Sequence, residues 1–180
     1  MKTVGRVLTI FAFVTAIACF LLLEASSAAV IRVKPDGNDG NSGESWALAK
    51  RTVSAAIASA SANDEIWVAA GTYQENIQNK VVSEGGVERA VDIALYGGFN
   101  GTETSRDQRN WELQPTLLDG GHSGPVVYIR GGAGLETRID GFIITKGTSG
   151  ISLFGSAATV AHNVITSNRG PGISCYNYKI

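Results

Sequence analysis

Hydrophobic and small polar residues recur at a fixed spacing between residues 137 and 175. The segments 137–153 and 159–175 match at five positions, each pair offset by 22 residues: Thr137/Thr159, Ile143/Ile165, Gly150/Gly172, Ile151/Ile173 and Ser152/Ser174. A fixed period of this size indicates a repeat in which one supersecondary unit stacks on the next. The constant offset predicts stacking without slippage across the unit.

Two repeat architectures have a period in this range, the leucine-rich repeat and the parallel β-helix. Leu and Asn are not placed here as a leucine-rich repeat would place them. Each unit instead holds a β-branched run, Ile139–Thr145 or Val160–Thr166, bounded by Gly, Asn and Ser. Such runs favour short strands joined by turns. We therefore predict a parallel β-helix whose rungs stack about 4.8 Å apart.

The residues before the repeat continue the strand pattern, with one exception. Residues 52–60 place Val53, Ala56, Ile57 and Ala60 on one face of a helix. Because the first rung of a solenoid would otherwise expose its apolar end, we interpret this helix as a cap. The remaining apolar runs predict four or five rungs, and a polar loop at 101–111 interrupts them. The strands predicted before the repeat lie at 30–33, 65–70, 91–96, 116–120 and 126–129.

The first 29 residues have the three-part pattern of a secretory signal peptide. Lys2 and Arg6 precede an apolar run, 7–23, and small residues follow at 26–29. The apolar run has 17 residues, which leaves an uncleaved membrane anchor as the alternative. We expect a secreted, extracellular or cell-surface protein with no membrane span after cleavage.

The charge and cysteine content of the mature chain, 30–180, argue against a nucleic-acid-binding protein and against a disulfide-stabilised one. Without Lys2, Arg6 and Glu24 it has 13 basic (15 − 2) and 15 acidic (16 − 1) residues, which is not the basic composition of a nucleic-acid-binding protein. Only Cys175 remains after cleavage, so no internal disulfide can form. Stability must then come from packing and from the β ladder.

Several segments resemble known β-helix proteins. Thr52-Val-x-x-Ala-Ile57 and Ile66-x-Val68-x-x-Gly71-Thr-Tyr-x-Glu75 are similar to the first segment of the pectin-lyase-like right-handed parallel β-helices. The block Tyr96–Trp111, followed by Thr116–Gly120, and the ending Gly172–Asn177 resemble secreted bacterial β-helix proteins of unassigned activity. The resemblance covers nearly all of 30–177 and implies a right-handed parallel β-helix, but it carries over no catalytic residues, because fold does not imply function.

The superfamily contains polysaccharide lyases, hydrolases and esterases, and its hydrolases need pairs of carboxylates at set separations. Asp119 and Asp140 each lie between an aliphatic residue and a glycine, and they are 21 residues apart. His162 lies 22 residues beyond Asp140. If stacked on adjacent rungs, these three side chains would lie about 4.8 Å apart. Two carboxylates at that distance could share a proton, bind a cation or act as acid and nucleophile.

The structural alternative is that Asp119, Asp140 and His162 occupy turns, because Asp-Gly favours a turn backbone. His122 is interpreted as a surface histidine. Arg106, Asp107 and Arg109 are interpreted as a salt-bridged loop, with sugar binding as the alternative. Trp46, Trp67 and Trp111 either pack under loops or stack on sugar rings, and Asn163 and Asn168 are interpreted as polar ladders along the stack.

No cofactor is evident in the sequence, and calcium is the one ion that it suggests. The cluster at 36–43 is rich in acidic and amide oxygens, the ligands that calcium requires. Its spacing departs from the usual alternation, because Gly40 occupies the position that follows Asp36 and Asn38. We therefore favour a solvated loop.

Two functions remain open. The chain stops after an apolar strand with no cap, which predicts that it is the amino-terminal part of a longer β-helix. The first hypothesis is a non-catalytic module that presents one face to a polysaccharide or to a cell-surface protein. The second is a lyase, hydrolase or esterase acting on acidic, pectin-like glycans through Asp119, Asp140 and His162.

Overall fold

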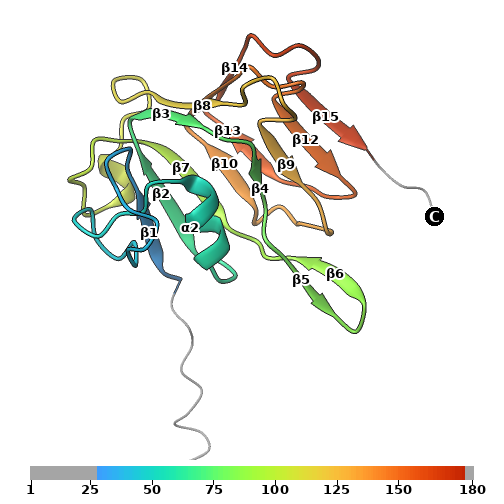
Figure 1. Ribbon diagram of the computed structural model, residues 1–180, viewed down its shortest axis with the longest axis horizontal. Coiled ribbons are helices and arrows are strands. Elements are labelled where there is room, and N and C mark those ends of the chain that lie inside the picture. Colours follow the sequence, from blue (N-terminus) through green and yellow to red (C-terminus); the bar gives the residue numbers. More distant parts are fainter. Residues whose placement is uncertain (1–27, 177–180) are drawn as a thin grey trace, which may run out of the picture.

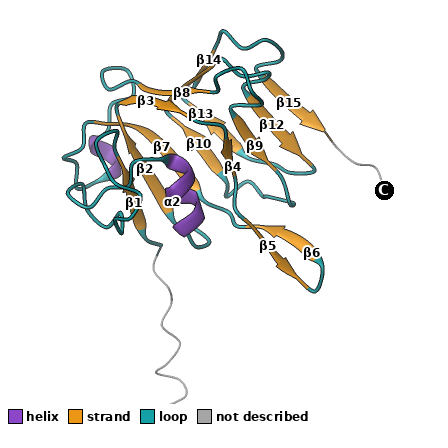
Figure 2. Cartoon of the chain, viewed as in Figure 1, coloured by secondary structure: helices purple, strands orange, loops and turns teal. Residues whose placement is uncertain are grey.

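The computed structural model describes residues 28–176, and strands dominate their regular structure (Figure 1). Within this part of the chain, helix is confined to the α-helix α2 (Val53–Ser59) and the 3-10 helix η1 (Arg106–Gln108), shown in purple in Figure 2. None of the helices in 28–176 has the length and apolar character needed to cross a membrane. The predicted signal peptide, 1–29, lies outside the described residues except for its last two.

Three parallel sheets form the body of the protein. Sheet A has the strand order β1-β2-β7-β10-β13, with bounds Val30–Val33, Glu65–Ala69, Ala94–Phe99, Arg138–Asp140 and Thr159–Ala161. Sheet B has the order β3-β8-β11-β14, with bounds Gly71–Gln74, Thr116–Asp119, Phe142–Thr145 and Val164–Ile165. Sheet C has the order β4-β9-β12-β15, with bounds Ile77–Gln78, Val127–Ile129, Ile151–Phe154 and Ile173–Tyr176.

The order of the strands follows the chain. From β2 onward, each pass of the chain adds one strand to sheet A, one to sheet B and one to sheet C. Every strand pair within these three sheets is parallel. The predicted all-β class with mostly parallel strands is confirmed, and this topology is compatible with a parallel β-helix.

The register confirms the repeat but not its constant offset. In sheet C, Ile151 pairs with Ile173, at the predicted spacing of 22. In sheets A and B the spacing is 21, because Arg138 pairs with Thr159 and Ile144 with Ile165. The prediction of stacking without slippage is therefore wrong. The additional residue lies in the turn between β14 and β15, where it changes no pairing within a strand.

The core consists of aliphatic side chains stacked from rung to rung. Ile66, Leu95 and Ile139 are register partners in sheet A, and each is almost completely buried. Ile77, Val127 and Ile151 form the corresponding stack in sheet C. Because neighbouring strands are about 4.8 Å apart, side chains in register contact each other directly and exclude water. One continuous core cluster contains both stacks.

Helix α2 lies beside β1, β2 and β4, and it buries Val53, Ala56 and Ile57 in the core. The predicted helix, 52–60, coincides with α2 and its two caps. Thr52 accepts the Ala55 N–H at 3.1 Å, as an N-cap residue does. The free N–H groups of Val53 and Ser54 donate to the Glu75 carboxylate at 2.8 and 2.9 Å.

Two segments differ from the predicted elements. The hairpin β5 (Val81–Glu84) and β6 (Val87–Ala90) is antiparallel, was not predicted, and projects from the body of the protein between β4 and β7 (Figure 1). The strand predicted at 91–96 begins and ends three residues later, at Ala94–Phe99. The predicted loop excursion is present, since no strand occurs between Asn100 and Pro115, and its only helical segment is η1.

Candidate functional site

The outer face of sheet A carries a row of polar and aromatic side chains. The register places Arg32, Trp67, Tyr96 and Asp140 side by side on β1, β2, β7 and β10. Side chains alternate across a strand, and the preceding residues Ile66, Leu95 and Ile139 point into the core, so this row faces outward. The loop 100–115 covers part of it and brings Arg106, Arg109 and Trp111 to the same face.

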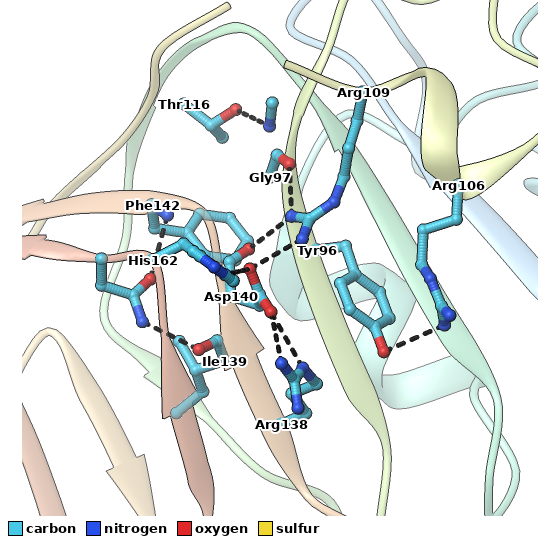
Figure 3. Close-up of polar contacts among 12 residues, drawn as sticks. Tyr96, Gly97, Arg106, Arg109, Thr116, Arg138, Ile139, Asp140, Phe142 and His162 are labelled. Atoms are coloured by element: carbon cyan, nitrogen blue, oxygen red, sulfur yellow. Dashed lines mark hydrogen bonds and ion pairs between the residues drawn. The ribbon is translucent and has the colours of Figure 1, made fainter. Parts of the chain in front are cut away.

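Asp140 is the centre of a charged cluster on this face (Figure 3). Its side chain is 1% exposed, and both of its oxygens are paired. Oδ1 accepts from Arg109 Nη2 at 2.8 Å and lies 3.0 Å from His162 Nδ1. Oδ2 accepts from Arg138 Nε at 2.9 Å and lies 2.7 Å from Arg138 Nη2. The carboxylate is therefore saturated by three side chains, which come from β10, from the turn after β13 and from the loop after η1.

These contacts set the protonation of Asp140. Burial alone would raise the pKa of its carboxyl group, but the hydrogen bonds from Arg109, Arg138 and His162 hold that pKa below the ordinary value for aspartate. A general acid needs a pKa raised toward the working pH. Asp140 is thus suited to orient its partners and not to deliver a proton.

Arg109 fastens the loop to the sheet. Its Nη1 donates to the carbonyl oxygens of Gly97, at 3.1 Å, and Asp140, at 3.3 Å. Its guanidinium carbon lies 5.0 Å from the Tyr96 ring centroid and 4.8 Å from that of Trp111, within cation–π range. Gly141 makes room for this side chain, since a Cβ there would lie 2.8 Å from Arg109 Nη1.

His162 lies at the solvent side of the cluster. Its side chain is 48% exposed, and its ring centroid is 4.4 Å from that of Trp111. Both residues line a hollow of about 400 Å³, and Glu112 and Asn163 also line it. Asp140 holds the Nδ1 side of the imidazole, which fixes the orientation of the ring at the edge of this hollow.

A second, more polar hollow lies on the other side of the Asp140 cluster. It has a volume of about 260 Å³, and Arg138 and Tyr96 line it together with Asn63, Glu65 and Glu136. Arg106 donates to the Tyr96 hydroxyl at 3.1 Å and to Glu65, so it extends the charged row toward β2. The Asp140 cluster is therefore flanked by two depressions with polar groups in their walls.

The structure does not place Asp119 with Asp140. Asp119 ends β8 in sheet B, where it pairs with Thr145 and Gln74, whereas Asp140 belongs to sheet A. The predicted column of the two carboxylates is wrong, because burial of Leu118 above Ile144 aligns β8 with β11 and not with β10. Asp140 and His162 are brought together as predicted, although the strand register pairs Asp140 with Ala161.

Asp119 instead stabilises a turn of sheet B. Its Oδ2 accepts from Lys146 Nζ at 2.7 Å and its Oδ1 from the Gly121 N–H at 3.0 Å. The hydrogen bond from Lys146 lowers the pKa of Asp119, with further contributions from Gly121 and from the nearby His122. His122 is therefore close to Asp119 and belongs to a separate cluster. The turn interpretation describes Asp119 better than the catalytic one.

Sequence reasoning missed the two arginines that pair with Asp140. Arg138 had a usable signal, because residues two apart on a strand share a face and Arg138 precedes Asp140 by two positions. Arg109 had none, because it lies 31 residues from Asp140 and reaches it from an irregular loop. Arg106 and Arg109 form ion pairs as predicted, but their partners are Glu65 on β2 and Asp140 on β10 and not Asp107 of the same loop.

The acidic cluster at 36–43 has a structural use. Asp39 Oδ1 accepts the N–H groups of Arg51 and Thr52 at 2.9 and 2.8 Å, just before helix α2. In residues 28–176, no three His, Cys, Asp or Glu side chains are grouped closely enough to hold a metal ion. Asn163 and Asn168 fulfil the predicted ladder role, since each donates to a carbonyl oxygen of the rung before it, at Ile139 and Ile144.

Comparison with known proteins identifies a family but no activity. Comparisons with curated proteins and with solved structures found no match. A protein-family profile described as a protein of unknown function (DUF1565), a family known as a β-helix-like domain, matches residues 35–180. The match spans 146 residues (180 − 35 + 1) of the 180, so the chain belongs to the DUF1565 family.

Proposed function

We propose that this protein is an exported, right-handed parallel β-helix of the pectin-lyase-like kind that binds carbohydrate without cleaving it. The fold proposal is supported by the three parallel sheets, by the 21- to 22-residue repeat and by the family match. In this proposal α2 caps the first rung, which agrees with its burial against β1 and β2. The export proposal rests on the pattern of residues 1–29.

The observation that carries the binding proposal is the hollow beside Trp111 and His162. Ligand sites combine apolar and aromatic walls with a few placed polar groups. The hollow is lined by the aromatic rings of Trp111 and His162, by the apolar residues Pro115, Ile143 and Val164, and by the polar residues Glu112 and Asn163. A sugar ring has apolar faces and hydroxyl edges, so it can stack on the indole while its hydroxyls reach the polar groups.

The state of Asp140 favours binding over hydrolysis. A glycosidase requires two carboxylates with different roles on opposite sides of the bond that is cleaved. Here one carboxylate is buried and saturated by Arg109, Arg138 and His162, and Asp119 lies in a different sheet. The cluster therefore supports the shape of the face and leaves the binding contacts to Trp111, His162 and their neighbours.

A second candidate is an enzyme that acts on acidic polysaccharide. The observation in its favour is the Asp140–His162 pair, in which a carboxylate orients an imidazole at the edge of a hollow. This is the relation between an orienting group and a general base in many active sites. It is the less favoured candidate, because Arg109 and Arg138 already neutralise the carboxylate.

The binding proposal is tested by titration calorimetry with polygalacturonate and with a neutral β-glucan. Trp111→Ala should weaken binding roughly tenfold or more, since an aromatic anchor contributes a large share of the energy of an interface. Leu113→Ala is the matched control, because Leu113 lies in the same loop, is 74% exposed and is absent from the lining of the hollow. A thermal melt of each variant confirms that the fold is intact.

The outcomes separate the candidates. Binding that Trp111→Ala weakens and Leu113→Ala leaves unchanged supports the proposal, whereas equal binding by both variants contradicts it. Absence of binding to either glycan also contradicts it and favours a protein partner. Release of unsaturated or reducing ends by the unaltered protein, abolished by His162→Ala, would establish the enzyme instead.

A further inference from the structure

The turn that follows β7 contains the dipeptide Asn100-Gly101. Asn100 is exposed and is the only asparagine in the sequence that precedes glycine. Gly101 has a φ of +94° and no atom within 4 Å of the position that a Cβ would occupy. The peptide nitrogen of Gly101 is therefore free of the side-chain bulk that normally hinders the approach of the neighbouring amide.

The side-chain carbonyl of Asn100 is polarised by Thr102. The Thr102 N–H donates to Asn100 Oδ1 at 2.9 Å, and the Thr102 hydroxyl donates to the same oxygen at 2.6 Å. Two donors directed at one carbonyl oxygen are the arrangement that stabilises the negative charge of a tetrahedral intermediate. The oxygen that would carry that charge here belongs to the Asn100 amide.

Glu103 places a carboxylate beside the nitrogen that would attack. The Gly101 N–H donates to Glu103 Oε2 at 3.1 Å, and Glu103 is only 7% exposed. The Asn100 N–H donates to Oε1 of the same carboxylate at 2.7 Å, which holds it in place. A carboxylate within hydrogen-bonding distance of the proton that must be removed meets the geometric requirement for a general base.

We propose that this turn is a self-modification site at which Asn100 deamidates faster in the folded protein than in the unfolded chain. The Gly101 nitrogen attacks Cγ of Asn100 as Glu103 accepts its proton, and an N–Cγ bond forms. The Cγ–Nδ2 bond then breaks, and ammonia leaves with the proton that Glu103 held. Water opens the resulting succinimide to aspartate or isoaspartate, so the balance is one water consumed and one ammonia released, with no redox change.

The modification would act on the loop that carries the candidate binding face. Either product places a new carboxylate at residue 100, next to the carboxylate of Glu103, and the isoaspartate product also lengthens the backbone by one carbon. Like charges at close range destabilise each other. The backbone carbonyl oxygen of Glu103 also accepts a hydrogen bond from Trp46 Nε1, at 2.9 Å. A new charge beside Glu103 therefore weakens the attachment of the segment that leads to Arg109 and Trp111.

The test follows conversion of Asn100 by peptide mass mapping in the full chain, incubated at neutral pH with and without denaturing urea. The native protein should convert Asn100 faster than the denatured protein, by on the order of tenfold or more if the general base contributes as it does in enzymes. Asn38 and Asn41, in the same samples, are internal references that should remain unchanged. A native rate equal to or below the denatured rate overturns the proposal.

Two variants identify the groups responsible. Glu103→Gln keeps a hydrogen-bond acceptor but removes the base, and Thr102→Val removes the hydroxyl donor. Each should slow conversion in the native protein and leave the rate in urea unaltered. If Glu103→Gln disturbs the loop, Thr102→Val still tests the proposal, because within residues 28–176 the Thr102 hydroxyl bonds only to Asn100 Oδ1. Native rates that neither variant changes would refute the assigned roles.

Discussion

The Arg109 guanidinium and the Asp140 carboxylate lie 2.8 Å apart, and their side chains are only 9% and 1% exposed. The pair connects the loop after η1 to the outer face of sheet A. A buried charge whose partner is removed costs far more free energy than an exposed one, because water cannot replace the lost contact.

Asp140→Ala should therefore lower the free energy of unfolding by about 3–5 kcal/mol, since it leaves Arg109 and Arg138 facing each other without a counter-charge. Urea denaturation measures this change. Asp36→Ala is the control, because the Lys34–Asp36 ion pair is exposed and should contribute at most about 1 kcal/mol. Similar losses in both variants would contradict the assigned role of Asp140.

The same carboxylate predicts a pH dependence. The pKa of Asp140 is lower in the folded protein than the value of about 3.9 for an unfolded aspartate. The unfolded chain then binds the proton more readily, so the stabilisation is complete above about pH 4 and is lost as the pH falls toward the folded-state pKa. The difference in urea midpoint between the unaltered protein and Asp140→Asn should narrow in this acidic range. A difference that is constant down to strong acid would contradict this prediction.

Glu75 stabilises α2 from outside the helix. Its carboxylate accepts the N–H groups of Val53 and Ser54 and the Ser54 hydroxyl, at the positive end of the helix dipole. Glu75→Ala should cost about 0.5–2 kcal/mol of unfolding free energy, the range found for loss of an N-cap. Thermal denaturation compares it with Glu84→Ala, an exposed glutamate of the β5–β6 hairpin that should change the stability little.

Gly98 has no room for a side chain. Its φ is +91°, and a Cβ would lie 2.7 Å from the backbone nitrogen and Cα of Trp111. Gly98→Ala would place a side chain in this contact, and it would also cost about 1–2 kcal/mol of backbone strain because of the positive φ. Gly132→Ala is the matched control, since Gly132 also has a positive φ, +75°, but open space around it. Gly98→Ala should be the more destabilising variant in urea denaturation, and equal effects would contradict a close contact between β7 and the loop.

The candidate site shows how far reasoning from sequence can reach. Asp140 and His162 were found because the repeat brings equivalent positions of successive rungs together. The Asp-Gly context of Asp119 predicts the same column. Burial of Leu118 over Ile144 instead pairs β8 with β11, so Asp119 lies in sheet B. Identical turn residues are weak evidence of register, whereas buried side chains determine it, since a one-residue slip exposes a whole apolar face.

The sequence by itself determined the parallel stacking of Ile151 on Ile173, the all-β class and the helix that begins after Thr52, because periodicity and capping are local properties. Only the tertiary structure decided that Arg109 would pair with Asp140 and that Trp111 would lie against His162. These contacts depend on where an irregular loop closes over a sheet. No spacing along the chain encodes that position, because the path of the loop is set by close approaches such as Gly98 to Trp111, which exist only after folding.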